Sequence, residues 1–334
     1  MRKIVKKSGK DFTVLNLTDP QLDRNDWEGG SNAVAILKYT LDELTERLHP
    51  DLITVSGDIS NAADPLDFSC FGDLIDRYGI PWAPIWGNHD NQAGEGPVEK
   101  GSADYLSRPL CLYEKGDPAL GKGNYVIAIE DEASGKTVEG LILFDSHNMI
   151  EYYDADGSFC QLWAKLIPEQ LDWYAGQIAA LEAIGCHDTT VIMHIPHYGF
   201  RQAWKAAWNG QTDPKSLSFA DSFDPVLWRD GYKGSLGVKR RSICCYEKDD
   251  GVLDLFERLG STHHVIAGHD HTNNFMINYR GIRHIYALKT GIGRSFAADL
   301  TGGTVLTVGE NGIKSVRHEV VDISAFLRLK KIKK

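Results

Sequence analysis

Residues 51–58 read DLITVSGD, a short apolar and β-branched run that stops at Gly57 and Asp58. Runs of this composition, bounded by glycine or another turn-forming residue, are typical of buried β-strands. Other stretches of the chain repeat the arrangement, and each of them also ends at a polar cluster. They cover residues 12–18, 82–86, 141–144, 190–193 and 263–267. The sequence therefore predicts six strands, each followed by polar side chains.

Amphipathic helices are expected between several of these strands. Apolar residues recur at helical spacing from Ala33 to Leu48, and residues 67–78 and 168–184 are further candidates. Strand, helix and strand in succession imply parallel pairing, with helices covering the sheet. Ligands of such sheets bind beyond the carboxyl ends of the strands, where the polar clusters lie. Later segments are predicted to form antiparallel strands of a second sheet. These are residues 275–279, 282–288 and 304–308.

The composition is that of an ordinary globular protein with an acidic body. Of the 334 residues, 42% are hydrophobic and 25% are charged, which suffices for a buried core. Acidic residues outnumber basic ones by 46 to 36, and the cations are concentrated in residues 1–10 and 325–334. Phosphate backbones require clustered cations, so no nucleic-acid partner is expected. The acidic body favours metal cations, and the basic ends are expected to be solvated.

A cytoplasmic location and no membrane partner are expected. The chain has no run of 18 apolar residues, and its first 21 residues fit a strand better than a signal peptide, because Asn16 and Asp19 interrupt the apolar run. The six cysteines are scattered without a CxxC pair, so reduced thiols are predicted. Adjacent Cys244 and Cys245 are expected on a strand, although a redox-active pair would have the same spacing.

The polar clusters offer donors for two divalent metal ions. Carboxylate, amide oxygen and imidazole in one region suit manganese, iron, zinc or a similar ion. Seven donors are too many for one catalytic ion and about right for two that share a carboxylate. The candidates are Asp19, Gln21, Asp58, Asn88, His194, His269 and His271. Two ions that face a phosphate oxygen supply a hydroxide at neutral pH and stabilise negative charge, which favours phosphoester hydrolysis.

The order of these clusters resembles the motifs of the calcineurin-like metallophosphoesterase family. The matching motifs are Asp19-Pro20-Gln21, Gly57-Asp58, Gly87-Asn88-His89-Asp90, His194 and Gly268-His269-Asp270-His271. Residues 143–146 (LFDS) and 168–173 (PEQLDW) are also similar to cytoplasmic-type relatives of purple acid phosphatases. The resemblance covers nearly the whole chain and implies an α/β fold, a four-layer α/β/β/α sandwich of two mixed sheets. It also implies one domain over residues 1–334, with a substrate-covering insertion at 197–250.

The resemblance gives each candidate a role. The first ion would be held by Asp19, Gln21, Asp58 and His271, and the second by Asp58, Asn88, His194 and His269. A metal-bound hydroxide would attack phosphorus. His89 would contact the phosphate or protonate the leaving oxygen, and Asp90 would orient the His89 ring. His197, Arg201 and His147 are further candidates for substrate contacts.

Two positions depart from the family pattern. Gln21 stands where histidine is usual, and an amide oxygen is a harder and weaker donor than imidazole, so manganese or iron is expected over zinc. Some branches of the family carry glutamine here, including ones that act on nucleotide diphosphate links. Asn61 stands where purple acid phosphatases carry a metal-binding tyrosine, so no iron–tyrosinate chromophore is expected.

The main prediction is a phosphoester hydrolase acting on a small phosphorylated substrate, with a slight preference for phosphomonoesters. A phosphodiesterase or nucleotide pyrophosphohydrolase is the alternative. Trp204 and Trp208 could stack on a base while Arg201 binds phosphate, although such tryptophans more often pack a helix. The third hypothesis is a catalytically inactive binding scaffold on the same fold. Such a protein is expected to lack several metal ligands, whereas here only the residue at position 21 differs from the family pattern. Nothing in the sequence indicates an oligomeric state.

Overall fold

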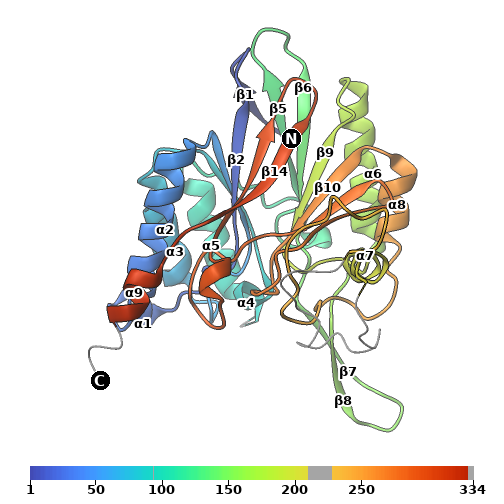
Figure 1. Ribbon diagram of the computed structural model, residues 1–334. Coiled ribbons are helices and arrows are strands. Elements are labelled where there is room, and N and C mark those ends of the chain that lie inside the picture. The colour runs from blue at the N-terminus through green and yellow to red at the C-terminus, as the bar shows by residue number, and fades with distance from the viewer. Residues whose placement is uncertain (93, 210–227, 330–334) are drawn as a thin grey trace.

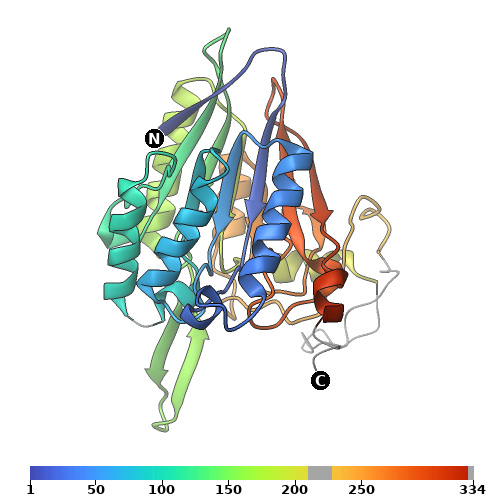
Figure 2. The same ribbon diagram turned by 90° about the vertical axis from the view of Figure 1, so that its left-hand side faces the viewer.

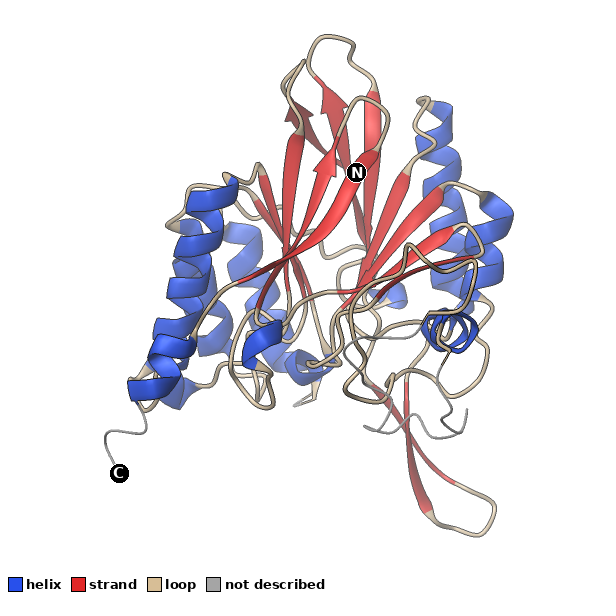
Figure 3. Cartoon of the chain, in the orientation of Figure 1, coloured by secondary structure: helices blue, strands red, loops and turns tan. Residues whose placement is uncertain are grey.

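Two β-sheets lie face to face at the centre of the protein, and helices cover the outer face of each sheet (Figure 1, Figure 3). The computed structural model describes residues 1–92, 94–209 and 228–329. The layers run helix, sheet, sheet, helix, which confirms the predicted four-layer α/β class. Residues 210–227 of the expected insertion at 197–250 lie outside the described residues.

The smaller sheet contains the first three predicted strands. Its order is β14-β13-β2-β3-β4. The strands are β2 (Phe12–Leu17), β3 (Leu52–Ser56), β4 (Trp82–Ile85), β13 (Gly302–Val308) and β14 (Ile313–Val320). Strands β2, β3 and β4 are parallel and almost entirely buried, as their apolar composition requires. Figure 2 shows the helices that cover this sheet, which are α2 (Ala33–Leu48), α3 (Pro65–Asp76) and α5 (Glu95–Ser107).

The larger sheet contains the other three predicted strands. Its order is β1-β5-β6-β9-β10-β12-β11. The strands are β1 (Arg2–Lys6), β5 (Tyr125–Asp131), β6 (Thr137–Leu143), β9 (Thr189–Met193), β10 (Thr262–Ala267), β12 (Ile282–Tyr286) and β11 (Met276–Tyr279). Its outer face is covered by α6 (Pro168–Ala183), α7 (Gly199–Ala207) and α8 (Val252–Leu259) (Figure 1). Helix α6 begins at Pro168, as predicted.

The late strands do not form a sheet of their own, so that part of the prediction is wrong. Strand β13 pairs antiparallel with β2, while β12 pairs parallel with β10 and antiparallel with β11. Each late strand thus extends a sheet that the early strands begin, and both sheets become mixed. An apolar run predicts that a strand exists, but the partner is decided by which sheet edge is open to it.

Smaller elements surround the end of the sandwich where the parallel strands finish. They are α1 (Arg24–Trp27), α4 (Asn88–Asn91), the 3₁₀ turns η1 (Pro118–Leu120) and η3 (Ala298–Leu300), and α9 (Ser324–Leu329). Strands β7 (Met149–Tyr153) and β8 (Phe159–Trp163) form a hairpin that extends well beyond the sheets (Figure 1). No strand was predicted from the sequence at either position.

Other predictions about the chain can be compared with the structure directly. Trp204 and Trp208 are buried with their rings 5.7 Å apart, so they pack the inner side of α7, which is the simpler of the two readings. All six cysteines are free, but Cys244 and Cys245 lie in a loop and not on the expected strand. None of the helices among the described residues is both long and apolar enough to cross a bilayer.

Candidate metal centre

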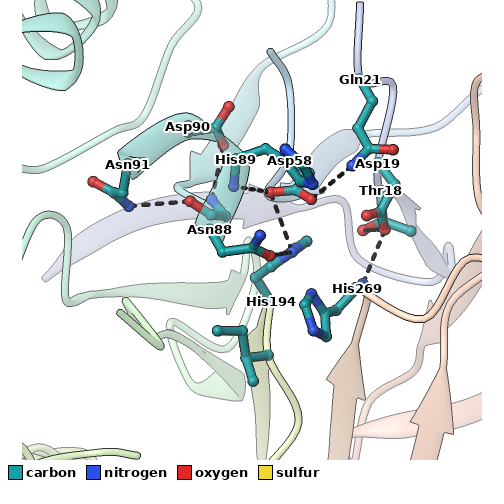
Figure 4. A network of polar contacts seen from close by, with 12 residues as sticks. Thr18, Asp19, Gln21, Asp58, Asn88, His89, Asp90, Asn91, His194 and His269 are labelled. Carbon is teal, nitrogen blue, oxygen red and sulfur yellow. Dashed lines mark hydrogen bonds and ion pairs between the residues drawn. The ribbon is translucent and has the colours of Figure 1, made fainter. Parts of the chain in front are cut away.

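The polar residues that follow five of the predicted strands meet at one end of the sandwich (Figure 4). The turns after β2, β3 and β4 come from the smaller sheet, and those after β9 and β10 come from the larger one. Backbone hydrogen bonds join the turns, with Asp19 N donating to Gly57 O at 3.0 Å and Gly268 N donating to His194 O at 3.1 Å. The site is therefore built across the junction of the two sheets.

The backbone of these turns adopts conformations that ordinary residues rarely take. Asp19, Gln21, Asp58 and His269 all have positive φ, between 47° and 75°. Such values cost free energy for residues with a Cβ and are found mainly where the surrounding structure enforces them, often at functional sites. The sharp turns bring each side chain back over the end of its own sheet.

Two glycines allow the turns to approach each other. Gly57 has φ of 90°, and a Cβ there would lie 2.7 Å from Gly87 N. A Cβ on Gly87 would overlap the carboxylate and the backbone nitrogen of Asp58. Glycine is needed at both positions because the turns after β3 and β4 touch through their backbones.

One cluster of donors consists of Asp58, Asn88, His194 and His269. The Nε2 atom of His194 lies 3.3 Å from Asp58 Oδ1 and 3.1 Å from Asn88 Oδ1. Donor atoms of Asp58, His194 and His269 all lie within 4.8 Å of one another, and all three residues are buried. One divalent ion could take all of these groups as ligands.

A second cluster consists of Asp19, Asp58 and His271, whose donor atoms also lie within 4.8 Å of one another. The Nε2 atom of His271 is 3.3 Å from Asp19 Oδ1. That carboxylate oxygen is buried and accepts no hydrogen bond, although the other oxygen of Asp19 accepts from Thr18 and from His269 N. A buried anionic oxygen with no hydrogen-bond donor is what a metal ligand looks like before the ion binds. The two clusters share Asp58, as a bridging carboxylate requires.

The orientation of two imidazoles also fits metal binding. Nδ1 of His194 lies 2.8 Å from Ser56 O, and Nδ1 of His271 lies 2.8 Å from Ser295 O. A backbone carbonyl can only accept a hydrogen bond, so the ring proton belongs on Nδ1 and the lone pair of Nε2 faces the carboxylates. Metal-binding histidines are commonly oriented in this way.

The buried carboxylates require positive charge nearby. Burial acts to raise the pKa of Asp19, but the adjacent ring of His271 and the charges of His194 and Lys289 hold that pKa well below its usual value. Burial acts to lower the pKa of His194, but the carboxylate of Asp58 outweighs it and raises the pKa to about 9. Burial lowers the pKa of His269 to about 3. Cations would supply the compensating charge without protonating an imidazole.

Gln21 does not present its oxygen to these clusters, contrary to its predicted role as a ligand. Its Nε2 donates to Asp58 Oδ2 at 3.0 Å, and its Oε1 accepts from Lys289 Nζ at 3.0 Å. Lys289 also donates to Asp19 O at 2.6 Å and is fully buried. Burial lowers the pKa of Lys289 to about 8, against the attraction of Asp19 and Asp58.

His89 lies beside the clusters, but Asp90 does not orient its ring. Nδ1 of His89 is 3.1 Å from Asn61 O, so a backbone carbonyl holds the imidazole. The carboxylate of Asp90 accepts from the backbone N–H groups of Gly87 and Ser60. Burial, with the neighbouring charge of Asp58, raises the pKa of Asp90 to about 8. The prediction for Asp90 is therefore wrong, because the residue caps α4 and ties the turns after β3 and β4 together.

The three proposed substrate contacts lie among other groups. His147 Nε2 is 2.7 Å from Gln170 Oε1 at the start of α6. His197 is buried among Phe200, Phe256 and His284, and burial lowers its pKa to about 3. Arg201 donates to Ile243 O at 3.0 Å. These surroundings favour structural roles for all three, and contact with substrate stays a prediction.

Two further residues contact the clusters and were not predicted from the sequence. Lys289 follows the apolar run at 282–288, so the rule that polar residues at strand ends mark the site also applies to it. Trp163 packs edge-to-face on His269, with ring centroids 4.4 Å apart. No sequence signal points to Trp163, because it lies at the base of the β7–β8 hairpin and belongs to none of the motifs.

Comparisons with known proteins agree with this geometry. Residues 12–273 match the sequence model of the calcineurin-like phosphoesterase family. A probable inactive purple acid phosphatase 28 of Arabidopsis thaliana is 26% identical over 74% of this chain and 59% of its own length. The glycerophosphodiester phosphodiesterase GpdQ of Enterobacter lignolyticus is 27% identical over 72% of this chain and 62% of its own. The chain thus spans about three fifths of the length of these curated relatives.

A solved structure supports the fold alone. A dimetal phosphatase from Danio rerio superposes with a TM-score of 0.52 at 14% identity, covering 92% of this chain and 98% of that one. Its sheets and helices match the sandwich described above, and at this identity the likeness says nothing of substrate.

Proposed function

Because the chain belongs to the calcineurin-like phosphoesterase family, we propose that it is a binuclear metal-dependent hydrolase of phosphoesters. The observation that supports this most directly is the pair of buried donor clusters that share Asp58, one of which contains the unpartnered Oδ1 of Asp19. Asp19, Asp58 and His271 would hold one ion, and Asp58, Asn88, His194 and His269 the other. Two such ions supply an activated water and neutralise charge on the phosphoryl oxygens.

His89 is placed to act on the leaving group. Its backbone N–H donates to Asp58 Oδ1 at 2.8 Å, which fixes the residue next to the shared carboxylate. The carbonyl of Asn61 accepts from Nδ1 and fixes the ring, so Nε2 is the nitrogen that can exchange a proton with a leaving group. We therefore assign His89 the role of protonating the departing oxygen.

The substrate we propose first is a small phosphomonoester, and a phosphodiester is the second candidate. The similarity to a glycerophosphodiester phosphodiesterase favours the second. The name of the inactive purple acid phosphatase favours a binding scaffold on the same fold, but the buried donor clusters of this chain argue against it.

We expect manganese or iron in the cluster of Asp19, Asp58 and His271. It offers carboxylate oxygens and only one imidazole, which suits these harder ions better than zinc. The other cluster has two imidazoles and accepts zinc more readily. Metal analysis of protein purified without chelator, with two tightly held zinc ions and no gain of activity with manganese, would contradict this preference.

A panel assay tests the proposed reaction. Protein stripped of metal and then given manganese should hydrolyse nitrophenyl phosphate, its bis-ester or ADP-ribose, and the preferred ester identifies the substrate class. Asn88→Ala and His269→Ala should lower turnover by about 10²-fold or more, since each removes a group that positions charge at the reacting centre. No bound metal and no turnover with any ester would favour the inactive scaffold.

A further inference from the structure

Lys289 is a buried lysine at the edge of the candidate metal centre, and it is not one of the candidate ligands. It follows β12, next to the turn after β2, and only 1% of its surface is exposed. A lysine so deeply buried is rare unless it is paired, because the ammonium loses its hydration. Its hydrogen bonds therefore indicate what it does.

Both oxygens that Lys289 contacts belong to the turn after β2. Nζ donates to Asp19 O at 2.6 Å and to Gln21 Oε1 at 3.0 Å. With its oxygen held in this way, Gln21 directs its amide N–H towards Asp58 Oδ2 at 3.0 Å. An amide nitrogen carries no lone pair that a metal ion could use, so Gln21 faces the shared carboxylate as a hydrogen-bond donor.

The two candidate ion positions are consequently expected to differ in their affinity for a metal ion. The one beside Asn88 has two imidazoles, an amide oxygen and a carboxylate within reach. The position beside Asp19 has two carboxylates and a single imidazole. The Lys289 ammonium donates a hydrogen bond to the backbone carbonyl of the same Asp19. Fewer donors and a neighbouring cation both weaken the attraction for a second cation.

We propose that Lys289 sets the metal stoichiometry by holding the Gln21 oxygen away from the ion position at Asp19, Asp58 and His271. The protein then retains one ion firmly, beside Asn88, and exchanges the other with solution. This inference rests on the proposed metal-dependent function and adds the residue that makes the two positions unequal.

Metal counting on the full chain tests the proposal without any enzyme assay. Protein stripped of metal is loaded with Mn²⁺, passed through gel filtration and analysed for bound manganese, while calorimetric titration follows the two binding steps. Wild-type protein should retain one ion per chain. Lys289→Met should retain two and bind the second at least about 10-fold more tightly, the size of effect expected when a residue that orients a ligand is changed.

Lys6→Met is the matched control. Lys6 is as deeply buried as Lys289 and pairs with Asp131 at 3.3 Å, but it lies in β1, the edge strand of the larger sheet, whereas the ligands from that sheet follow β9 and β10. The Lys6→Met variant should retain one ion per chain, the number expected for the wild-type protein. Lys289→Ala repeats the test with a smaller side chain in case Lys289→Met does not fold, as judged by circular dichroism.

A double-mutant cycle with Gln21→Ala separates the role of Gln21 from the loss of charge. If Lys289→Met frees the Gln21 oxygen to bind the ion, the gain in affinity should disappear in the double variant. A gain that persists without Gln21, or a wild-type protein that already retains two ions, would overturn the proposal. Retention of no ion at all by wild-type protein would instead contradict the proposed function.

Discussion

At the scale of single residues, Asp58 is the centre of the site. Its two oxygens meet His194, the backbone of His89 and the amide of Gln21, and it belongs to both donor clusters. The burial of a carboxylate this deep is tolerated because the turns after β2 and β4 donate hydrogen bonds to it, through the Gln21 amide and the His89 backbone N–H. A substitution near Asp58 should therefore affect metal binding only if the side chain that it removes faces this carboxylate.

Two buried histidines three positions apart provide a matched test of that distinction. His194→Ala should abolish retention of one ion and lower turnover by about 10²-fold, because Nε2 faces Asp58 and Asn88. His197→Ala should leave metal content unchanged and lower the free energy of unfolding by about 2–5 kcal/mol, because its ring packs on Phe200 and Phe256. Metal analysis and denaturant unfolding of both variants check this, and equal metal loss in the two would refute it.

The burial of Glu139 should make the free energy of unfolding depend on pH. It is fully buried on β6, with Thr190 donating to it at 2.8 Å and Asp188 as the charged neighbour, and burial raises its pKa to about 8. The folded protein thus binds this proton more tightly than the unfolded chain, whose glutamate titrates near 4.5. The contribution of Glu139 to stability is fully present below pH 4.5 and is lost as the pH rises towards 8.

The Glu139→Gln variant isolates that contribution. In wild-type protein, Glu139 should decrease the free energy of unfolding by at most about 1.4 kcal/mol per pH unit across this interval. The difference between wild type and Glu139→Gln should change with the same slope, which denaturant titrations from pH 5 to pH 8 measure. A difference that is constant with pH would show that Glu139 is ionised in the folded protein.

The identities of the candidate ligands could be predicted from sequence, but their contacts could not. Asp19, Asp58, Asn88 and the histidines were predicted because each follows an apolar run, and parallel strands finish at one end. The direction of the Gln21 amide depends on Lys289, which is 268 residues away in sequence. The same limit applies to Asp90, whose carboxylate is taken by two backbone N–H groups.

At the scale of elements, the close approach of two turns makes the site sensitive to small changes. Gly87 precedes α4 (Asn88–Asn91), and a Cβ on it would overlap Asp58. Gly87→Ala should therefore separate the turns, abolish metal retention and lower the melting temperature. Gly176→Ala in α6 is the control, because a Cβ there meets nothing within 4 Å and alanine favours the helix. Normal metal content in Gly87→Ala would show that the turns can shift.

The β7–β8 hairpin contacts the site through one residue at its base. Trp163 packs on His269, whereas Phe159 at the far end is largely exposed and contacts Tyr153. Trp163→Ala should weaken metal retention by about 10-fold, since it supports the orientation of a ligand ring. Phe159→Ala should not change it. Calorimetric titration with Mn²⁺ compares the two, and identical affinities would mean that His269 is held without Trp163.

The existence of elements was easier to predict than their pairing. All six early strands are present because nearly all of their apolar residues are buried. The hairpin was missed because its residues are mostly exposed, with β7 showing hardly any buried position, so no periodic apolar pattern marks it. The late strands were predicted correctly, but not their partners. The sequence alone does not indicate that β13 pairs with β2, because the paired residues are nearly 300 positions apart.

At the scale of the whole molecule, bound ions would join the two sheets. Asp19, Asp58 and Asn88 follow strands of the smaller sheet, while His194, His269 and His271 follow strands of the larger one. An ion that binds both sets only in the folded protein stabilises it by mass action, by about 3 kcal/mol at a hundredfold excess over its dissociation constant.

Chelation should therefore lower the melting temperature of the wild-type protein, and added Mn²⁺ should restore it. His194→Ala should show a smaller response, because one of the ions no longer connects the sheets. Scanning calorimetry with and without chelator measures both. An unchanged melting temperature in wild-type protein would mean that the ions contribute nothing to holding the sheets together.

The backbone geometry at the site has a consequence for the evolutionary history of the chain. Of the non-glycine residues with positive φ among the described residues, Asp19, Gln21, Asp58 and His269 are candidate ligands or their neighbours. Each such conformation costs on the order of 1–3 kcal/mol, and glycine would relieve much of it. A descendant that no longer needed the proposed reaction could relieve this backbone strain with glycine at these positions. Loss of the proposed activity should therefore be easy to acquire and hard to reverse.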